Sequence, residues 1–122
     1  MPKLLSICGT SRPGNYTGHA LAVVNDQLRD AGVELQTFAA ADLTLAFPGQ
    51  PATADSERLT QAVSEASGVI LATPEYHGTF SAMTKLIIEN LGFPSALQGK
   101  AVGLLGVAAG RIGAIKSLEQ LR

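Results

Sequence analysis

A loop rich in glycine and hydroxyl residues follows the first apolar segment of the chain and has the composition of an anion site. Gly9-Thr10-Ser11-Arg12-Pro13-Gly14 comes directly after an apolar run that ends at Cys8, and a helical pattern begins near Thr17. Glycines let the backbone approach an anion, and the N–H groups at a helix N-terminus attract negative charge. Because the Arg12 guanidinium can add a charge-assisted hydrogen bond, the sequence predicts a phosphate-bearing ligand here.

The glycine spacing disfavours two common nucleotide-binding motifs. Gly99-Lys100 is followed by Ala101, so the chain lacks the Gly-Lys-Ser/Thr signature of a Walker loop. Gly9 and Gly14 are too far apart for the Gly-x-Gly-x-x-Gly pattern of a dinucleotide site. The first loop therefore favours a monophosphate over a nucleoside triphosphate, and an ordinary strand-to-helix turn is the alternative.

A second loop, Pro74-Glu75-Tyr76-His77-Gly78-Thr79, combines a rigid residue, an aromatic ring and a glycine. Tyr76 offers a planar face, and Gly78 permits close approach of a flat ligand. His77 has no companion nucleophile nearby, and Glu75 can either cap a neighbouring helix or pair with a base. The composition indicates contact with a planar ring, and the alternative is a rigid loop whose Tyr and His are incidental.

A third loop, Gly110-Arg111-Ile112-Gly113, places another helix start after an apolar strand, and the alternative is that it serves helix entry only. The two histidines, His19 and His77, lie far apart, and no Ser-His-Asp or Cys-His order is present. Neither covalent catalysis nor a metal site is therefore predicted. A phosphate loop and a flat-ring loop without acid–base residues point to a bound cofactor that carries the chemistry.

Alternating strand and helix patterns must position these loops. Strand patterns cover residues 3–8, 33–38, 69–73 and 101–107. Helical patterns cover residues 17–31, 55–67 and 81–91, and a fourth runs from the third loop to the chain end. This alternation predicts an α/β fold with a parallel sheet in the strand order 2-1-3-4 and helices on both faces. Ligands bind where the strand order reverses, so we expect the three loops to converge on one cleft.

Composition supports a single domain over residues 1–122. The chain is 46% hydrophobic and 16% charged, and its net charge is −1 with both signs scattered. We therefore expect neither nucleic acid nor a membrane as partner. Cys8 is the only cysteine, which excludes an internal disulfide and predicts a buried thiol. With no long apolar leader at its N-terminus, the chain is expected to be a cytoplasmic protein.

The three loops together resemble the motifs of the NADPH-dependent FMN reductase family, the group that includes azoreductases and chromate reductases. Gly9–Thr17 resembles the phosphate loop of that family, and Thr73–Thr79, with Lys85 further on, resembles its flavin-ring loop. Gly110–Gly113, followed by Leu118–Arg122, resembles its third loop and helix. Because the resemblance spans essentially the whole chain, it implies a flavodoxin-like, doubly wound sheet in a three-layer fold.

The resemblance also implies FMN bound without a covalent link and NADPH as hydride donor. Electrons would then pass to a quinone, an azo compound, a metal oxyanion or free flavin, and no side chain would be required as a catalytic group. The residues that the resemblance assigns are Ser11, Arg12, Asn15, Tyr16 and Thr17 for the phosphate, Pro74, Glu75, Tyr76, His77 and Gly78 for the isoalloxazine ring, and Gly110 and Arg111 for the ring border.

The chain departs from the family pattern in several places. Asn15 stands where serine is usual, His77 where asparagine is usual, and Ser81 where proline is common. The sequence also stops at Arg122, before the fifth strand and helix of the family. The fourth predicted strand would then be an edge and the first helix would lose a neighbour, which predicts a truncated form or a homo-oligomer.

Two further functions stay open at this point. One is a flavodoxin-type electron carrier, and the other is a truncated, cofactor-free domain that acts through protein contacts. Carriers of the flavodoxin type are generally strongly acidic and hold phosphate without arginine. The net charge of −1 and the presence of Arg12 therefore favour the reductase.

Overall fold

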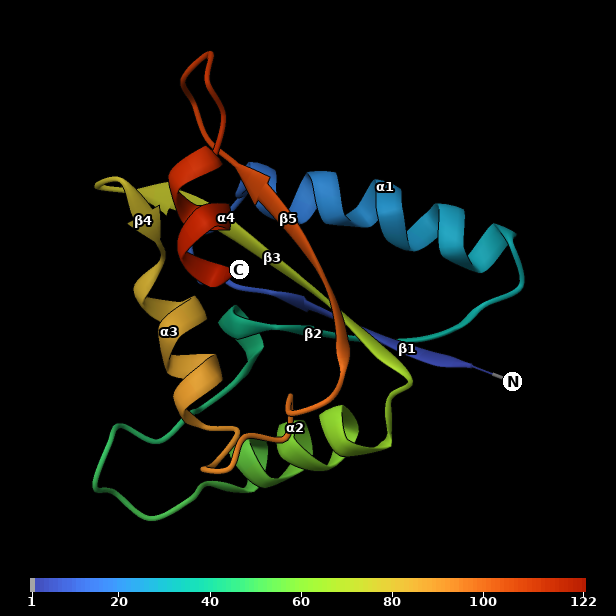
Figure 1. Cartoon of the computed structure of the whole chain (residues 1–122), viewed down its shortest axis with the longest axis vertical. Helices are drawn as coiled ribbons and strands as arrows, with labels where there is room; N and C mark the ends of the chain where they lie inside the picture. Colours follow the sequence, from blue (N-terminus) through green and yellow to red (C-terminus); the bar gives the residue numbers. More distant parts are fainter. Residues whose placement is uncertain (1) are drawn as a thin grey trace.

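Strands and helices alternate along the chain, and the computed structural model describes residues 2–122 (Figure 1). The strands are β1 (Lys3–Cys8), β2 (Glu34–Ala39), β3 (Gly68–Tyr76), β4 (Thr79–Phe80) and β5 (Ala101–Val107). The helices are α1 (Tyr16–Asp30), the 3-10 turn η1 (Ala40–Asp42), α2 (Ala54–Glu65), α3 (Ala82–Glu89) and α4 (Ile115–Leu121). No helix within residues 2–122 has the length and apolar character needed to cross a membrane.

The long strands pair in parallel in the order β2-β1-β3-β5, and β4 pairs antiparallel with the end of β3. Because β5 is the fourth long strand along the chain, this arrangement confirms the predicted order 2-1-3-4. Parallel strands joined by helical crossovers place the carboxyl ends of β1, β3 and β5 at one edge of the sheet. All three predicted loops begin at that edge.

The end of β3 differs from the prediction. The segment from Pro74 to Tyr76, expected as loop, continues the strand, and Pro74 stands opposite Val107 in the ladder with β5. Tyr76 then pairs with Thr79 across a two-residue turn formed by His77 and Gly78. Both turn residues have positive φ, 52° and 76°, as a type I′ hairpin turn requires.

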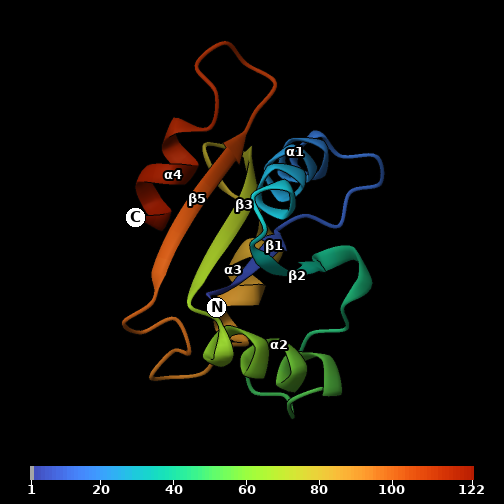
Figure 2. The same cartoon turned by 90° about the vertical axis from the view of Figure 1, so that its right-hand side faces the viewer.

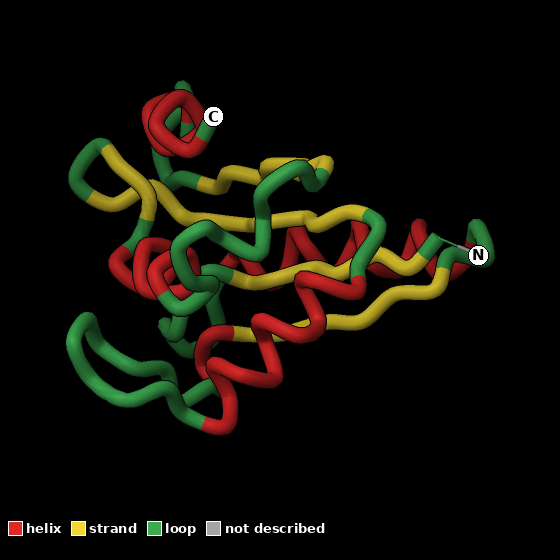
Figure 3. The backbone as a smooth tube through the Cα atoms, turned by 60° about the horizontal axis from the view of Figure 1, so that its bottom comes forward, coloured by secondary structure: helices red, strands yellow, loops and turns green. Residues whose placement is uncertain are grey.

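The sheet is covered on both faces, as predicted for near-continuous apolar strands (Figures 2 and 3). On one face, Leu5 and Ile7 of β1 pack in a cluster with Leu59 and Val63 of α2 and Ile87 of α3. Neighbouring positions of β1 point the other way, because side chains alternate along a strand. The main core therefore lies between the sheet and the pair α2 and α3.

On the opposite face, Cys8 and Ala72 pack with Leu21 of α1. The thiol of Cys8 is buried, which confirms the prediction, and burial raises its pKa because it disfavours the thiolate. A buried thiol of this kind acts as a small apolar side chain. Cys8 therefore belongs to the packing between α1 and the sheet.

Within residues 2–122, α1 alone covers its face of the sheet, because α4 packs on the other side. Gly106 of β5 lies against Ala114 and Leu118, and Leu121 packs with the main core. Among residues 2–122, β5 pairs only with β3, and its first residues, Ala101–Gly103, are exposed. Strand β5 is therefore the edge strand that the sequence predicted, and Val23 is an exposed apolar residue of the first helix.

The segment between β2 and α2 is held by a side-chain amide. Asn90 Nδ2 donates to the Ala46 carbonyl oxygen at 2.9 Å, and Asn90 Oδ1 accepts from the Ala46 N–H at 3.0 Å. The apolar residues Leu43, Leu45 and Phe47 of this segment are expected from the sequence to pack against the body of the protein. Leu43 and Leu45 do so. Phe47 is 64% exposed, so for this residue the expectation is wrong.

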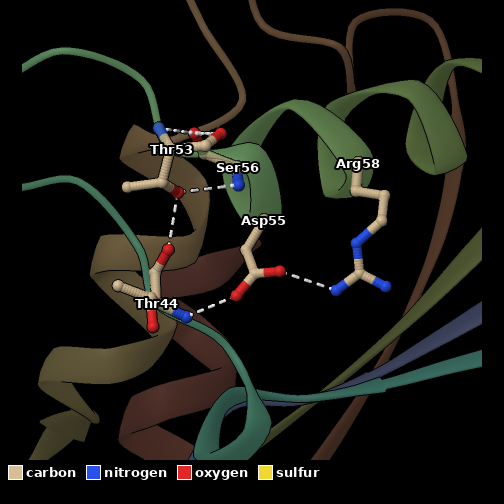
Figure 4. Close-up of polar contacts among 5 residues, drawn as sticks. All are labelled: Thr44, Thr53, Asp55, Ser56 and Arg58. Carbon is tan, nitrogen blue, oxygen red and sulfur yellow. Dashed lines mark hydrogen bonds and ion pairs between the residues drawn. The ribbon is translucent and has the colours of Figure 1, made fainter.

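The start of α2 is fixed by a capping box and by Asp55 (Figure 4). The sequence offers Thr53 or Asp55 as the cap of this helix, and the structure confirms Thr53, whose Oγ1 accepts from the Ser56 N–H at 3.0 Å. Asp55 Oδ2 accepts from the Thr44 N–H at 2.8 Å, and its Oδ1 pairs with Arg58 Nη2 at 2.7 Å. The Thr44 hydrogen bond first, and then Arg58, hold the pKa of Asp55 below its ordinary value.

This lowered pKa predicts how stability depends on pH. A carboxyl whose folded pKa is depressed adds stability at pH values above its unfolded pKa, and that stability is lost as the pH falls through the folded pKa. We expect Asp55→Asn to unfold at lower urea concentration than the parent at about pH 7, with the difference shrinking towards about pH 2. Urea titrations of both proteins between about pH 2 and pH 7 measure this difference in stability. A difference that stays constant with pH would contradict the role of the Asp55 carboxylate.

Candidate cofactor site

The β1–α1 loop is shaped by two of its own side chains. Asn15 caps α1, since its Oδ1 accepts from the Gly18 N–H at 2.5 Å and its Nδ2 donates to the Arg12 carbonyl oxygen at 2.8 Å. The buried Thr10 accepts from the Arg12 N–H at 3.2 Å through Oγ1. Both bonds restrain the Arg12 backbone, while the residue itself is exposed. The ion pairs recorded within residues 2–122 do not include Arg12.

Gly9, at the start of this loop, lies too close to its surroundings for any other residue. A Cβ on Gly9 would sit 2.6 Å from the Ala72 carbonyl oxygen and even nearer to Thr84 Oγ1. The Gly9 N–H also donates to the Ala72 carbonyl oxygen at 2.7 Å, so the peptide is tied to β3. The loop therefore leaves the sheet at a fixed point.

The end of β3 presents Tyr76 to solvent and uses Glu75 elsewhere. Glu75 Oε1 accepts from the Ser117 N–H at 2.9 Å, in the first turn of α4. This is the helix-capping role that the sequence left open for Glu75. Pro74 is buried, and its carbonyl oxygen accepts from Ser117 Oγ at 3.3 Å. The β3 segment is thereby attached to α4.

A pocket of about 410 Å³ joins the first two predicted loops. Its walls come from the β1–α1 loop, the end of β3 and the first turn of α3. The lining residues are Thr10, Ser11, Arg12, Tyr76, Ser81, Ala82 and Met83. A guanidinium, a serine hydroxyl, a helix N-terminus and an aromatic side chain therefore share one hollow. That set suits an anion attached to a flat apolar group.

The third loop does not contribute to this pocket. Gly110, Arg111 and Ile112 are exposed and are absent from its lining, and Figure 1 shows the loop after β5 projecting beyond the sheet. The expected convergence on one cleft therefore holds for two of the three loops here. The second predicted loop instead contacts the helix that follows the third loop, because Thr79 Oγ1 donates to Gln120 Oε1 of α4.

The other predicted ligands lie around the pocket rather than in its lining. Tyr16 is exposed at the first turn of α1, with its ring edge-to-face against His19. Thr17 is buried beneath the same turn. His77 and Gly78 form the hairpin turn next to Tyr76.

Sequence reasoning missed several residues that line or flank the site. Thr10, Ser81 and Met83 line the pocket, and Lys116 of α4 lies over the turn, with Nζ 3.7 Å from the position of a Cβ on Gly78. A serine directly before a helical pattern is a cap signal, which could have identified Ser81. Lys116 gave no such local signal because it reaches the turn only through the packing of α4.

A larger cavity of about 590 Å³ lies at the other end of α3, lined by the segment around Phe47 and by Phe93. It contains no Arg or Lys in its lining, and its one charged residue is Glu89. An anionic ligand would find no cation there. Residues 2–122 also hold no group of three or more His, Cys, Asp or Glu side chains that could bind a metal ion.

Comparison with known proteins shows the family of the chain. The family described as NADPH-dependent FMN reductase matches residues 2–122. The chain is 34% identical over 122 residues to an NADPH azoreductase of a Bacillus species, covering 98% of this chain and 66% of that protein. It is 30% identical over 129 residues to an NAD(P)H-dependent FMN reductase of Pseudomonas aeruginosa, covering 98% and 67%.

Solved structures share the fold. An NADH:FMN oxidoreductase in its apo form superposes with a TM-score of 0.82 at 22% identity, covering 100% of this chain and 66% of that one. The NAD(P)H:acceptor oxidoreductase FerB of Paracoccus denitrificans gives a TM-score of 0.81 at 22% identity, covering 99% and 69%. These likenesses confirm the flavodoxin-like fold. The chain spans about two thirds of the length of these relatives, and it belongs to the NADPH-dependent FMN reductase family.

Proposed function

We propose that the chain is an FMN-dependent NAD(P)H oxidoreductase that binds FMN between the β1–α1 loop and the end of β3. The observation that carries the proposal is the shared pocket of Ser11, Arg12 and Tyr76. FMN combines a monophosphate with a flat ring system, which are the two chemical features that this pocket suits. Family membership over residues 2–122 supports the same cofactor.

Each part of the site has a role in this proposal. Ser11 and Arg12, with the N-terminal turn of α1, would hold the phosphate, and Asn15 would keep the loop in shape. The backbone from Pro74 to Gly78 would lie along the isoalloxazine ring. FMN held there would supply the redox chemistry, namely hydride transfer from NADPH and electron transfer to an acceptor. The protein would then need to place the ring rather than provide a nucleophile.

The proposed acceptors are a quinone, an azo compound, a metal oxyanion or free flavin. One relative is named an azoreductase and another an FMN reductase, so a panel of these four classes is the natural assay. Reduction rates measured with NADPH and NADH, for each acceptor in turn, would rank the donors and the acceptors. An electron carrier would instead need a separate reductase to transfer electrons from NAD(P)H to its flavin.

FMN binding tests the proposal before any catalysis is measured. Titration of the 122-residue chain into FMN should quench the flavin fluorescence to saturation with one FMN per chain. Riboflavin, which lacks the phosphate, should bind more weakly because Arg12 loses its partner. Unquenched fluorescence throughout the titration would favour the cofactor-free alternative and overturn the proposal.

We also propose that the protein works as a cytoplasmic homo-oligomer. The exposed edge of β5 at Ala101–Gly103 and the side chain of Val23, which is 64% exposed on α1, support association. Light scattering coupled to gel filtration measures the mass in solution. A monomer that persists at high protein concentration would contradict the oligomer.

A further inference from the structure

Three buried hydroxyl side chains form a cluster beside the proposed cofactor pocket, and one of them, Ser81, also lines the pocket. Thr73 lies near the end of β3, Ser81 caps α3, and Thr84 is in the first turn of α3; their exposed fractions are 0%, 3% and 0%. None of them is among the residues that the sequence assigns to FMN. Buried polar groups require partners, and the partners of this cluster are specific.

Two members of the cluster bind the same carbonyl oxygen. Ser81 Oγ donates to the Gly9 carbonyl oxygen, and Thr84 Oγ1 donates to it at 3.0 Å. Ser81 Oγ in turn accepts from the Thr84 N–H at 3.1 Å, as a helix cap. A carbonyl oxygen has two lone pairs, so two hydroxyl donors satisfy it fully. The Gly9 peptide is thereby held from the α3 side.

The third member joins the cluster to the ring segment. Thr73 Oγ1 accepts from the Ser81 N–H at 3.3 Å and donates to the Pro74 carbonyl oxygen at 2.8 Å. The cluster therefore links the first peptide of the phosphate loop to the segment that begins at Pro74. In the proposed site, the phosphate loop would bind the phosphate of FMN and the segment that begins at Pro74 would contact its ring.

Only a glycine allows this link to form. Since a Cβ at position 9 would fall between Thr84 Oγ1 and the Ala72 carbonyl oxygen, the hydroxyl can reach the Gly9 peptide only when that Cβ is absent. The Gly9 N–H is bound to Ala72 on the other side, at 2.7 Å. Both backbone polar groups of Gly9, its N–H and its carbonyl oxygen, are thus fixed in a buried environment, where hydrogen bonds are strong and hard to replace.

We propose that Ser81 and Thr84 are positioning residues that hold the Gly9 peptide and so set the separation between the phosphate loop and the ring segment. The inference rests on the proposed function, because it takes FMN as the ligand that spans the two parts. A site with a fixed separation binds its ligand with less ordering cost than a loop that must be fixed on binding. Neither side chain needs to touch FMN for this effect.

Thr84→Val tests the proposal with the smallest change, because it removes the hydroxyl at nearly constant volume. We expect FMN to bind about five- to tenfold more weakly to this variant. Thr84→Ser, which keeps the donor, should restore the affinity. The circular dichroism of bound flavin should follow the same pattern, since it reports the surroundings of the ring.

Thr60→Val is the matched control. Thr60 Oγ1 donates to the Ser56 carbonyl oxygen at 2.8 Å and also contacts the Asn90 carbonyl oxygen at 3.1 Å, at the far end of α3. This variant also loses a hydroxyl that donates to a backbone carbonyl oxygen, at a half-buried position, and it should leave FMN affinity unchanged. If Thr84→Val and Thr60→Val lost FMN affinity equally, the effect of Thr84→Val would come from a general loss of stability. That result would overturn the proposal.

Hydrogen exchange of the FMN-free chain separates this proposal from the proposed function. The amides of residues 10–12, 14 and 15 should exchange faster in Thr84→Val than in the parent, and Thr60→Val should not change their exchange rates. Unchanged exchange in Thr84→Val would overturn the positioning role even if the parent binds FMN. Absence of FMN binding by the parent would overturn the proposed function, and with it the effect on cofactor affinity.

Discussion

Gly9→Ala is expected to lower the free energy of unfolding by about 3 kcal/mol or more and to abolish FMN binding. The new Cβ would lie 2.6 Å from the Ala72 carbonyl oxygen, a backbone atom in the centre of the sheet. Neither that atom nor the Gly9 peptide can move without breaking hydrogen bonds between β1, β3 and α3. Urea unfolding followed by far-ultraviolet circular dichroism measures the loss.

Gly103→Ala is the control for this substitution. Gly103 lies in β5, and a Cβ there would make an ordinary 3.8 Å contact with Ile70. We expect the free energy of unfolding of Gly103→Ala to stay within about 0.5 kcal/mol of that of the parent. The double variant Gly9→Ala/Thr84→Ala removes the side-chain clash but leaves the clash with Ala72, so it should remain unstable. A Gly9→Ala protein as stable as the parent would show that the loop does not leave the sheet as described.

Arg12→Ala is expected to weaken FMN binding by about 1.5–3 kcal/mol, or about 10- to 150-fold, while the fold stays intact. The guanidinium would donate charge-assisted hydrogen bonds to phosphate oxygens, and alanine offers neither the charge nor the donors. Fold stability should not change, because the residue is exposed and the ion pairs recorded within residues 2–122 do not involve it. Fluorescence titration with FMN measures the affinity.

Two further measurements assign the Arg12 effect to phosphate recognition. Riboflavin affinity should be nearly the same in Arg12→Ala and the parent, because riboflavin has no phosphate. Arg29→Ala removes an exposed arginine from the last turn of α1 and should leave FMN affinity unchanged. FMN affinity that is unaffected by Arg12→Ala would mean that Arg12 points away from the ligand.

Most of the fold could be predicted because its signals are local. Apolar runs such as residues 3–8 mark strands buried on both faces, and the strand–helix alternation then restricts the sheet to few orders. The signals for helix starts are also local, since Thr53 stands directly before a helical pattern and its side chain accepts from the Ser56 N–H three residues later.

The extension of β3 could not be predicted in this way. Proline usually ends a regular strand, and here the ladder continues because Pro74 lies opposite Val107 of β5, far away in the sequence. The hairpin turn at His77-Gly78 could not be predicted from its residue types either. Its turn needs positive φ at both positions, and histidine is an uncommon residue for the first of them.

The sequence predicted the chemical character of the separate loops, but not how the fold brings them together. Glycine, arginine and tyrosine at strand ends indicated an anion and a flat ring, and the pocket joins Arg12 and Tyr76. Gly110 and Arg111 are exposed in the loop that projects beyond the sheet, and no local sequence pattern predicts the direction of that loop. The cluster of Ser81 and Thr84 on Gly9 depends on contacts between residues more than 70 positions apart, which only the folded chain reveals.

Anaerobic reduction by NADPH is the most direct measurement of the proposed function. The 122-residue chain is loaded with FMN, freed of excess cofactor and mixed with NADPH in the absence of oxygen, while the visible absorbance of the flavin is followed. The proposed oxidoreductase predicts that the flavin absorbance bleaches rapidly with one NADPH per FMN, and that an added quinone restores it. Bound FMN that stays oxidised in excess NADPH, and is bleached only when a separate reductase is added, would contradict the enzyme and identify an electron carrier.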